Sequence, residues 1–164
     1  MVIHGRNTQA VGAMFEYLSA LDLNPITWNE AVAQTRLGTP HNLDAVRAAM
    51  ESAQVIVALF TPDDLAYLRP ELSDVVEEPA GQPRPNALLE TGMALALMPK
   101  DTIIVHLGRI RPASDLEGLN HVSLPGQREN LAQRLEQRGC LVDMSSGKWR
   151  TAGDFEAALT PLTT

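Results

Sequence analysis

Apolar positions recur along the chain with two different spacings, and the spacing changes where one element gives way to the next. Short continuous apolar runs predict buried strands at residues 1–4, 26–28, 55–60, 102–107 and 121–124. Apolar residues three and four positions apart predict helices at residues 9–21, 43–53, 86–98 and 127–138. Residues 141–144 are a candidate edge strand, and Asp154 is a candidate N-cap for a last short helix at 155–162.

Strands that alternate with helices favour an α/β fold in which parallel strands are joined by right-handed crossovers. We therefore predict a flavodoxin-like, doubly wound, five-stranded parallel sheet in a single domain that covers residues 1–164. In such sheets ligands bind at the edge where the carboxyl ends of the strands meet. The segments expected to gather at that edge are Gly5–Asn7, Trp28–Glu30, Thr61–Asp64 and Asn86–Glu90.

Two connections separate the predicted elements. Residues 29–42 read as a mobile loop with at most a partial helical turn. Residues 61–85 form a longer connection that contains six acids and five prolines. Connections of that length in a compact domain are usually functional or disordered.

The helix predicted at 86–98 carries a single charge, Glu90. Pro85 favours an extended residue before it, and Asn86 is a good N-cap. Glu90 shares a helical face with mostly apolar residues, and the positive end of the helix is expected to keep its carboxylate ionised. Such a group suits the stabilisation of a developing cation. The competing interpretation is an acid that merely complements the helix dipole.

Composition excludes several classes of function. The chain has 164 residues, 20 acids against 13 bases, a net charge of −7 and no basic run, so nucleic acid and anionic membranes are poor partners. A single cysteine, Cys140, excludes an internal disulfide and fits a reducing compartment. No long apolar run or leader is present, which predicts a cytoplasmic protein. The histidines and Cys140 show no paired ligand spacing, so no metal site is expected, and glycine-rich phosphate-binding motifs are absent.

Several residues at the predicted edge have both a functional and a structural interpretation. Arg6, beside Gly5 in the first loop, can fork onto a phosphate or a carboxylate. Trp28 can stack on a ligand ring or belong to the core. Asp63 and Asp64 fit a turn better than a catalytic role, because aspartate is a routine turn former.

Four segments, in the correct order, resemble the bacterial TIR-like "predicted nucleotide-binding" domains, which are similar to the effector domains of the CBASS and Pycsar antiviral systems. The later Gly153–Phe155 is also similar to that family. The four segments are His4–Asn7 (HGRN), Trp28–Ala33 (WNEAVA), Leu59–Asp64 (LFTPDD) and Arg84–Leu95 (RPNALLETGMAL).

The resemblance implies an NAD+ glycohydrolase (NAD+ nucleosidase) whose single essential glutamate is Glu90. NAD+ is then the substrate, and no cofactor is required. Nicotinamide in NAD+ is already a cationic leaving group, so one carboxylate that stabilises oxocarbenium character suffices. The implied substrate-binding residues are Gly5, Arg6, Asn7, Trp28, Glu30, Thr61 and Asn86.

The resemblance also implies self-association. In such effectors a sensor domain binds a cyclic nucleotide and stacks the TIR domains, and the second-strand loop of one completes the site of the next. This chain has no sensor domain, so we expect it to be one domain of a longer protein.

Three alternatives remain open from the sequence. A nucleoside 2-deoxyribosyltransferase shares the flavodoxin-like sheet and a glutamate nucleophile. A non-catalytic TIR adaptor acts by self-association and does not need Glu90. A passive nucleotide-binding domain binds NAD+ without turnover.

Overall fold

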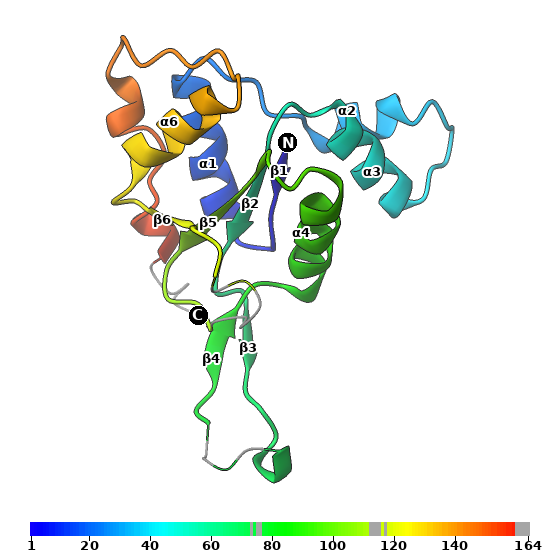
Figure 1. Cartoon of the computed structure of the whole chain (residues 1–164), viewed down its shortest axis with the longest axis vertical. Coiled ribbons are helices and arrows are strands. Elements are labelled where there is room, and N and C mark those ends of the chain that lie inside the picture. The colour runs from blue at the N-terminus through cyan, green and yellow to red at the C-terminus, as the bar shows by residue number, and fades with distance from the viewer. Residues whose placement is uncertain (73, 75–76, 112–115, 117, 160–164) are drawn as a thin grey trace.

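The computed structural model describes residues 1–72, 74, 77–111, 116 and 118–159. Within them, four parallel strands form the central sheet in the order β1-β2-β5-β6 (Figure 1). Their bounds are β1 Val2–Ile3, β2 Ile56–Phe60, β5 Thr102–Leu107 and β6 Val122–Leu124. The sheet is flanked by helices, which confirms the predicted α/β, flavodoxin-like fold class.

Helices cover both faces of the sheet. Helices α1 (Thr8–Ala20) and α6 (Arg128–Gln137) pack on one face, and α3 (Asn42–Ser52) and α4 (Pro85–Leu97) pack on the other (Figure 1). The alternation along β2 explains this. Val57 and Leu59 join the core beneath α1 and α6, whereas Ile56, Ala58 and Phe60 join the core beneath α3 and α4. A strand buried on both faces has to be apolar at every position.

The chain after α6 also packs into the core. Phe155 is fully buried and contacts the Tyr17 ring edge-on, with 6.1 Å between ring centroids. Gly153 has a φ of +75°, and a Cβ there would lie 2.1 Å from the carbonyl oxygen of Ala13. Only glycine therefore lets this segment lie against α1.

The strand predicted at 26–28 is wrong, because Trp28 is the first residue of helix α2 (Trp28–Gln34). Thr27 caps this helix. Its hydroxyl accepts from the Glu30 N–H, while the Glu30 carboxylate accepts from the Thr27 N–H. This reciprocal capping box starts a helix where an apolar run alone suggested a strand. The described sheet consequently has four strands rather than five, and half of the predicted loop at 29–42 is helical.

Most other predicted elements are present, with ends that move by no more than one residue. Residues 141–144 are not a strand, although the Asp143 N–H donates to the Leu21 carbonyl at 2.9 Å. The predicted last helix is reduced to a 3-10 turn, η3 (Ala157–Leu159), and residues 160–162 lie outside the described chain. A second 3-10 turn, η2, spans Lys148–Arg150.

The connection predicted at 61–85 contains a β-hairpin. Strands β3 (Asp64–Ala66) and β4 (Ala80–Gln82) pair antiparallel, and a 3-10 turn, η1 (Pro70–Leu72), lies near the tip. The hairpin projects away from the central sheet (Figure 1). Among the described helices, none combines the length and the apolar character needed to cross a membrane.

Candidate functional site

The loop after β1 holds three of the predicted substrate-binding residues, Gly5, Arg6 and Asn7. The Asn7 side chain is occupied at both ends. Its Oδ1 accepts from the Ala10 N–H at 3.0 Å and caps α1, and its Nδ2 donates to the Ala158 carbonyl at 2.9 Å. Asn7 therefore fixes the loop and the C-terminal segment, while the Arg6 side chain is left exposed.

Asp63 joins the loop after β1 to the loop after β2. The buried Thr61 donates its hydroxyl to Asp63 Oδ1 at 2.5 Å, and Asp63 Oδ2 accepts the backbone N–H of Arg6. The Asp63 N–H also bonds the Thr61 carbonyl at 2.8 Å, so the turn expected from the sequence is present. Turn chemistry alone did not predict the bond between Asp63 Oδ2 and the Arg6 N–H. This bond fixes the ends of β1 and β2 relative to each other.

Gly5 makes this bridge possible. A Cβ at this position would lie 1.7 Å from Asp63 Oδ2, well inside any permitted contact. The glycine is thus required by the close approach of a carboxylate. The structure brings Gly5, Arg6 and Thr61 together, as the sequence predicted. The residue that joins them is Asp63, which the sequence analysis assigned to a turn and not to substrate binding.

Glu90 lies on α4, two residues further from the start of the helix than the sequence suggested. Arg84 is the N-cap, with the extended backbone (φ −52°, ψ 141°) that a following proline favours, and Pro85 is the first helical residue. Asn86 is exposed on the first turn of α4, so the prediction that it is the N-cap is wrong. Counting from Pro85, Glu90 is the sixth helical residue.

The electrostatics of Glu90 differ from the prediction. Its carboxyl group is partly buried, and burial raises its pKa above the usual value for glutamate. The sequence predicted that the helix dipole would keep Glu90 ionised, which would lower its pKa. This prediction is wrong, because the dipole acts within the first turn and Glu90 lies beyond it. Desolvation is the largest effect on this group, and it disfavours the charged form.

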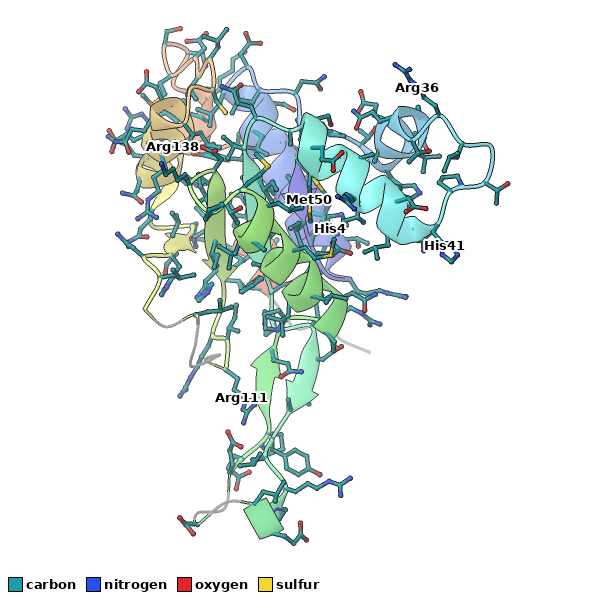
Figure 2. All side chains as sticks on the ribbon, turned by 45° about the vertical axis from the view of Figure 1, so that its right-hand side comes forward. His4, Arg36, His41, Met50, Arg111 and Arg138 are labelled. Carbon is teal, nitrogen blue, oxygen red and sulfur yellow. The ribbon has the colours of Figure 1, made fainter. Side chains whose placement is uncertain are left out.

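His4 is the neighbour whose charge acts on the Glu90 carboxyl group. Positive charge on its imidazole lowers the pKa of Glu90 and so opposes the effect of burial. Figure 2 shows the His4 side chain emerging from the end of β1 beside α4. Its Nδ1 lies 3.0 Å from the Gly5 carbonyl oxygen, which helps to orient the ring. Sequence reasoning missed His4 as a site residue, although its place directly after β1 is a usable signal.

Trp28 and Glu30 are placed elsewhere. Both are on α2, which packs against α3, and Figure 1 shows this pair level with the start of β1, away from the hairpin. Trp28 is 52% exposed. Hydrogen bonds from the Thr27 backbone and hydroxyl lower the pKa of Glu30, whose carboxylate is occupied by the capping box. Without a strand at 26–28, nothing carries these residues to the carboxyl edge of the sheet.

Three rings stack across neighbouring strands: Phe60 ends β2, His106 is the penultimate residue of β5, and His121 directly precedes β6. The His106 ring stacks on Phe60 with 5.8 Å between centroids and on His121 with 4.0 Å. Burial, with the His121 charge as a second cause, lowers the pKa of His106 to about 4. In the described part of the chain, no cluster of three or more histidine, cysteine or acidic residues is arranged to hold a metal ion.

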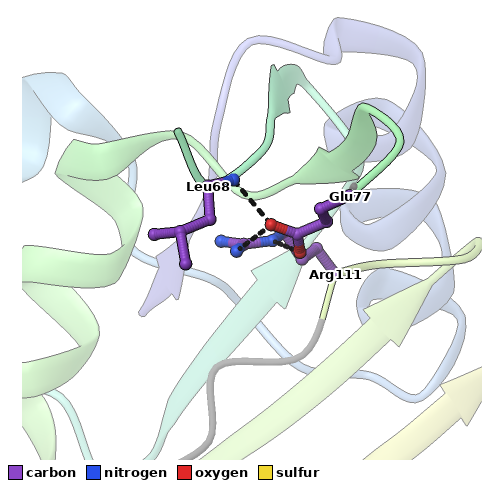
Figure 3. Close-up of polar contacts among 3 residues, drawn as sticks. All are labelled: Leu68, Glu77 and Arg111. Carbon is purple, nitrogen blue, oxygen red and sulfur yellow. Dashed lines mark hydrogen bonds and ion pairs between the residues drawn. The ribbon is translucent and has the colours of Figure 1, made fainter. Parts of the chain in front are cut away.

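The hairpin next to this edge is tethered by an ion pair. Arg111 donates from Nε and Nη2 to the two Glu77 carboxylate oxygens, at 2.9 and 3.0 Å (Figure 3). Glu77 Oε2 also accepts the Leu68 N–H at 2.6 Å. The Arg111 N–H donates to the Gly81 carbonyl at 2.6 Å, so the chain after β5 holds the second arm of the hairpin, and Glu77 joins that arm to Leu68 on the first.

The fold and the site together define a parallel α/β domain with a partly buried acid at the carboxyl edge of its sheet. The family model described as "CAP12/Pycsar effector protein, TIR domain" matches residues 1–125, and the chain belongs to this family of antiviral TIR effectors. The resemblance inferred from the four sequence segments is thereby confirmed. Neither a curated protein nor a solved structure matches the chain.

Proposed function

We propose that this TIR domain is an NAD+ glycohydrolase that depletes NAD+ as an antiviral effector, with Glu90 as the catalytic residue. The observation that supports the proposal is the partly buried Glu90 carboxylate, on the helix that follows the β3–β4 hairpin and near His4 at the end of β1. Strand ends in this kind of sheet are where ligands bind.

The reaction requires one well-placed anion. The bond between ribose C1′ and the nicotinamide nitrogen breaks, and its electron pair leaves with nicotinamide, which departs neutral. The ribose acquires oxocarbenium character, which the Glu90 carboxylate stabilises. Water then adds to C1′ and loses a proton, giving ADP-ribose, nicotinamide and one H+.

Burial of Glu90 favours this role. A carboxylate with few surrounding waters attracts a cation more strongly than an exposed carboxylate does, because the local dielectric constant is lower. The cationic nicotinamide riboside of NAD+ can therefore compensate for the hydration that Glu90 has lost. Positive charge on the His4 imidazole favours the ionised form of the acid and so opposes the effect of burial.

Other residues have supporting roles in the proposal. Arg6 is exposed beside Gly5 and can bind the pyrophosphate, and Asn86 is exposed on the first turn of α4. Thr61 acts through Asp63, which fixes the loop that carries Arg6. Trp28 and Glu30 are distant on α2, so we assign them to the site of a neighbouring copy. That assignment fits activation by self-association under a cyclic-nucleotide sensor domain.

Nicotinamide release from NAD+ tests the proposal. The assay uses high protein concentration, with and without fusion to an oligomerising scaffold, and compares the wild type with Glu90→Gln. Loss of release in Glu90→Gln, with full release in the exposed control Glu129→Gln, is the expected result. Equal release by the wild type and Glu90→Gln contradicts the proposal. Base exchange on a deoxynucleoside instead of nicotinamide release identifies the 2-deoxyribosyltransferase alternative.

A further inference from the structure

We propose that the β3–β4 hairpin of one molecule docks into a cation-rimmed pocket at the opposite end of the sheet of a second copy of this chain. The contact joins two different surfaces and therefore runs head to tail. Its evidence is the apolar and acidic character of the hairpin, the apolar and basic character of the pocket, and their positions at opposite ends of the molecule.

The hairpin exposes large apolar side chains. Leu65 is 77% exposed, Leu72 is 69% exposed and Tyr67 is 57% exposed. The acids Glu71 and Glu78 are exposed on the same hairpin. We call Leu65, Tyr67, Glu71, Leu72 and Glu78 the hairpin surface. The hairpin also exposes Asp74 and Arg69, so acids outnumber cations among its described exposed residues. Apolar groups that project together from a soluble domain, with charges around them, mark an interaction site.

The pocket lies at the start of β5, between the C-terminal ends of α4 and α6. It has a volume of about 380 Å³, and its apolar lining includes Ile103 and Ile104. Three cations, Lys100, Arg134 and Arg138, also line it, and its described lining contains no acid. We call this site the basal pocket. A chain with a net charge of −7 has thus gathered three positive charges around one apolar opening.

The hairpin surface and the basal pocket complement each other in apolar character and in charge. A leucine or tyrosine from the hairpin can fill the apolar opening, while Glu71 and Glu78 approach the cations at its rim. Opposite charges that surround an apolar contact steer association and fix its register. Two hairpins repel each other, as do two basal pockets, so the charges favour contact between unlike surfaces.

Topology places the two surfaces at opposite ends of the sheet. The hairpin follows the carboxyl end of β2, whereas the basal pocket lies at the amino end of the parallel strand β5. Figure 2 shows the same separation, with Arg138 of the basal pocket far from Arg111 at the base of the hairpin. When a hairpin docks into the basal pocket of another molecule, the pair still has one free hairpin and one free basal pocket. Further molecules can therefore join, and the contact builds a linear oligomer.

This contact is separate from the segment 28–42, which the family resemblance implicates in stacking. It also does not depend on NAD+ cleavage, because its readout is molecular mass. A failure of the docking proposal therefore leaves the proposed chemistry untouched, and the reverse also holds.

Sedimentation velocity over a wide range of protein concentration gives the first test. We expect the weight-average mass of the whole chain to rise above the 17.8 kDa of one molecule as concentration increases, with a dissociation constant of roughly 10–100 μM, as for a small polar interface. A mass that stays at 17.8 kDa up to a concentration of about 1 mM overturns the proposal.

Charge reversal gives the second test. The hairpin variant is Glu71→Lys/Glu78→Lys, and the pocket variant is Lys100→Glu/Arg138→Glu. We expect each alone to associate at least about tenfold more weakly than the wild type. A mixture of the two should associate again, because the intact hairpin of the pocket variant meets the intact basal pocket of the hairpin variant, and the reversed hairpin and the reversed pocket also attract each other. A chain with all four substitutions should recover association.

Two controls complete the design. Glu16→Lys and Lys148→Glu reverse exposed charges away from both surfaces and should associate like the wild type. Circular dichroism checks that every variant is folded. Wild-type association by both double variants overturns the proposal, as does a mixture that behaves like either variant alone.

Discussion

His4 lies close enough to Glu90 for positive charge on its imidazole to lower the pKa of the Glu90 carboxyl group, against the burial that raises it. The two residues come from distant parts of the sequence, one at the end of β1 and the other on the second turn of α4. Parallel strands that end at one edge bring them together. The ionisation of the proposed catalytic acid therefore depends on a second residue.

Replacing His4 should shift the pH dependence of NAD+ cleavage. Without the His4 charge, the pKa of Glu90 rises further, so the acid limb of the kcat/KM profile should move to higher pH. We expect His4→Ala to move this limb upward in pH and to leave the rate on the plateau above it unchanged. His41→Ala, a change at the exposed N-cap residue of α3, should leave the profile unchanged. A profile identical to that of the wild type would show that His4 does not influence the acid.

Glu90→Gln should abolish activity and yet stabilise the fold. The folded-state pKa of Glu90 is raised, so ionisation of this group is harder in the folded than in the unfolded chain. The resulting cost is present above the folded pKa and absent below the unfolded pKa. Glutamine removes the cost, so the free energy of unfolding should rise at neutral pH and not at acid pH. Thermal unfolding of Glu90→Gln and of exposed Glu16→Gln at two pH values measures the difference.

Gly5→Ala should be strongly destabilising. Its Cβ would overlap Asp63 Oδ2 and break the bond to the Arg6 N–H, at a cost of about 2–3 kcal/mol in the free energy of unfolding. Gly12→Ala is the matched control. Gly12 lies inside α1, and a Cβ there would have no neighbouring atom within 4 Å. Alanine at this position should therefore raise the free energy of unfolding by about 0.5–1 kcal/mol. Urea denaturation distinguishes the opposite signs.

A double-mutant cycle identifies the cause of the Gly5 effect. Because the overlap is with the Asp63 carboxylate, Asp63→Ala should remove most of the additional cost of Gly5→Ala. The two substitutions together should thus cost less than the sum of the single effects. Additive effects would mean that the backbone around Gly5, and not the carboxylate, excludes a side chain.

The sequence predicted much of the fold because strong patterns coincide with buried elements. The runs at 55–60 and 102–107 are strands, and the periodicity at 9–21 and 127–138 gives helices. The prediction from sequence failed at 26–28, where the reciprocal hydrogen bonds between Thr27 and Glu30 start a helix in spite of the apolar run.

The candidate site was predictable only in part. Residues at strand ends, such as Gly5 and Thr61, follow from the topology. The role of Asp63 does not, since its partner on Arg6 lies far away in the sequence and is a backbone group. Nor does the raised pKa of Glu90, because burial depends on what packs around α4 and not on the position of the residue within the helix.

The stacked ring of His106 should make stability depend on pH. The pKa of His106 is about 4 in the folded chain, compared with 6.5 in an unfolded one. The unfolded state therefore binds more protons between these values, and the free energy of unfolding should fall as pH decreases from 6.5 to about 4. Allowing for solvent screening, the loss is about 2 kcal/mol. His106→Phe keeps the stack and should remove this part of the pH dependence, whereas His41→Asn should retain it.

The ion pair between Glu77 and Arg111 should control local opening of the hairpin. Hydrogen bonds from Arg111 and from the Leu68 N–H lower the pKa of Glu77, so the tether is present above the unfolded pKa and is lost as pH falls through the lower folded value. Glu77→Gln should have the same effect at neutral pH, because it removes the charge. We expect faster amide hydrogen exchange at residues 64–68 and 80–82 than in the wild type, with unchanged exchange in β2 and β5. Asp74→Asn, at an exposed position of the same hairpin, should exchange like the wild type. Equal exchange in Glu77→Gln and Asp74→Asn would mean that the bond between the Arg111 N–H and the Gly81 carbonyl holds the hairpin without the ion pair.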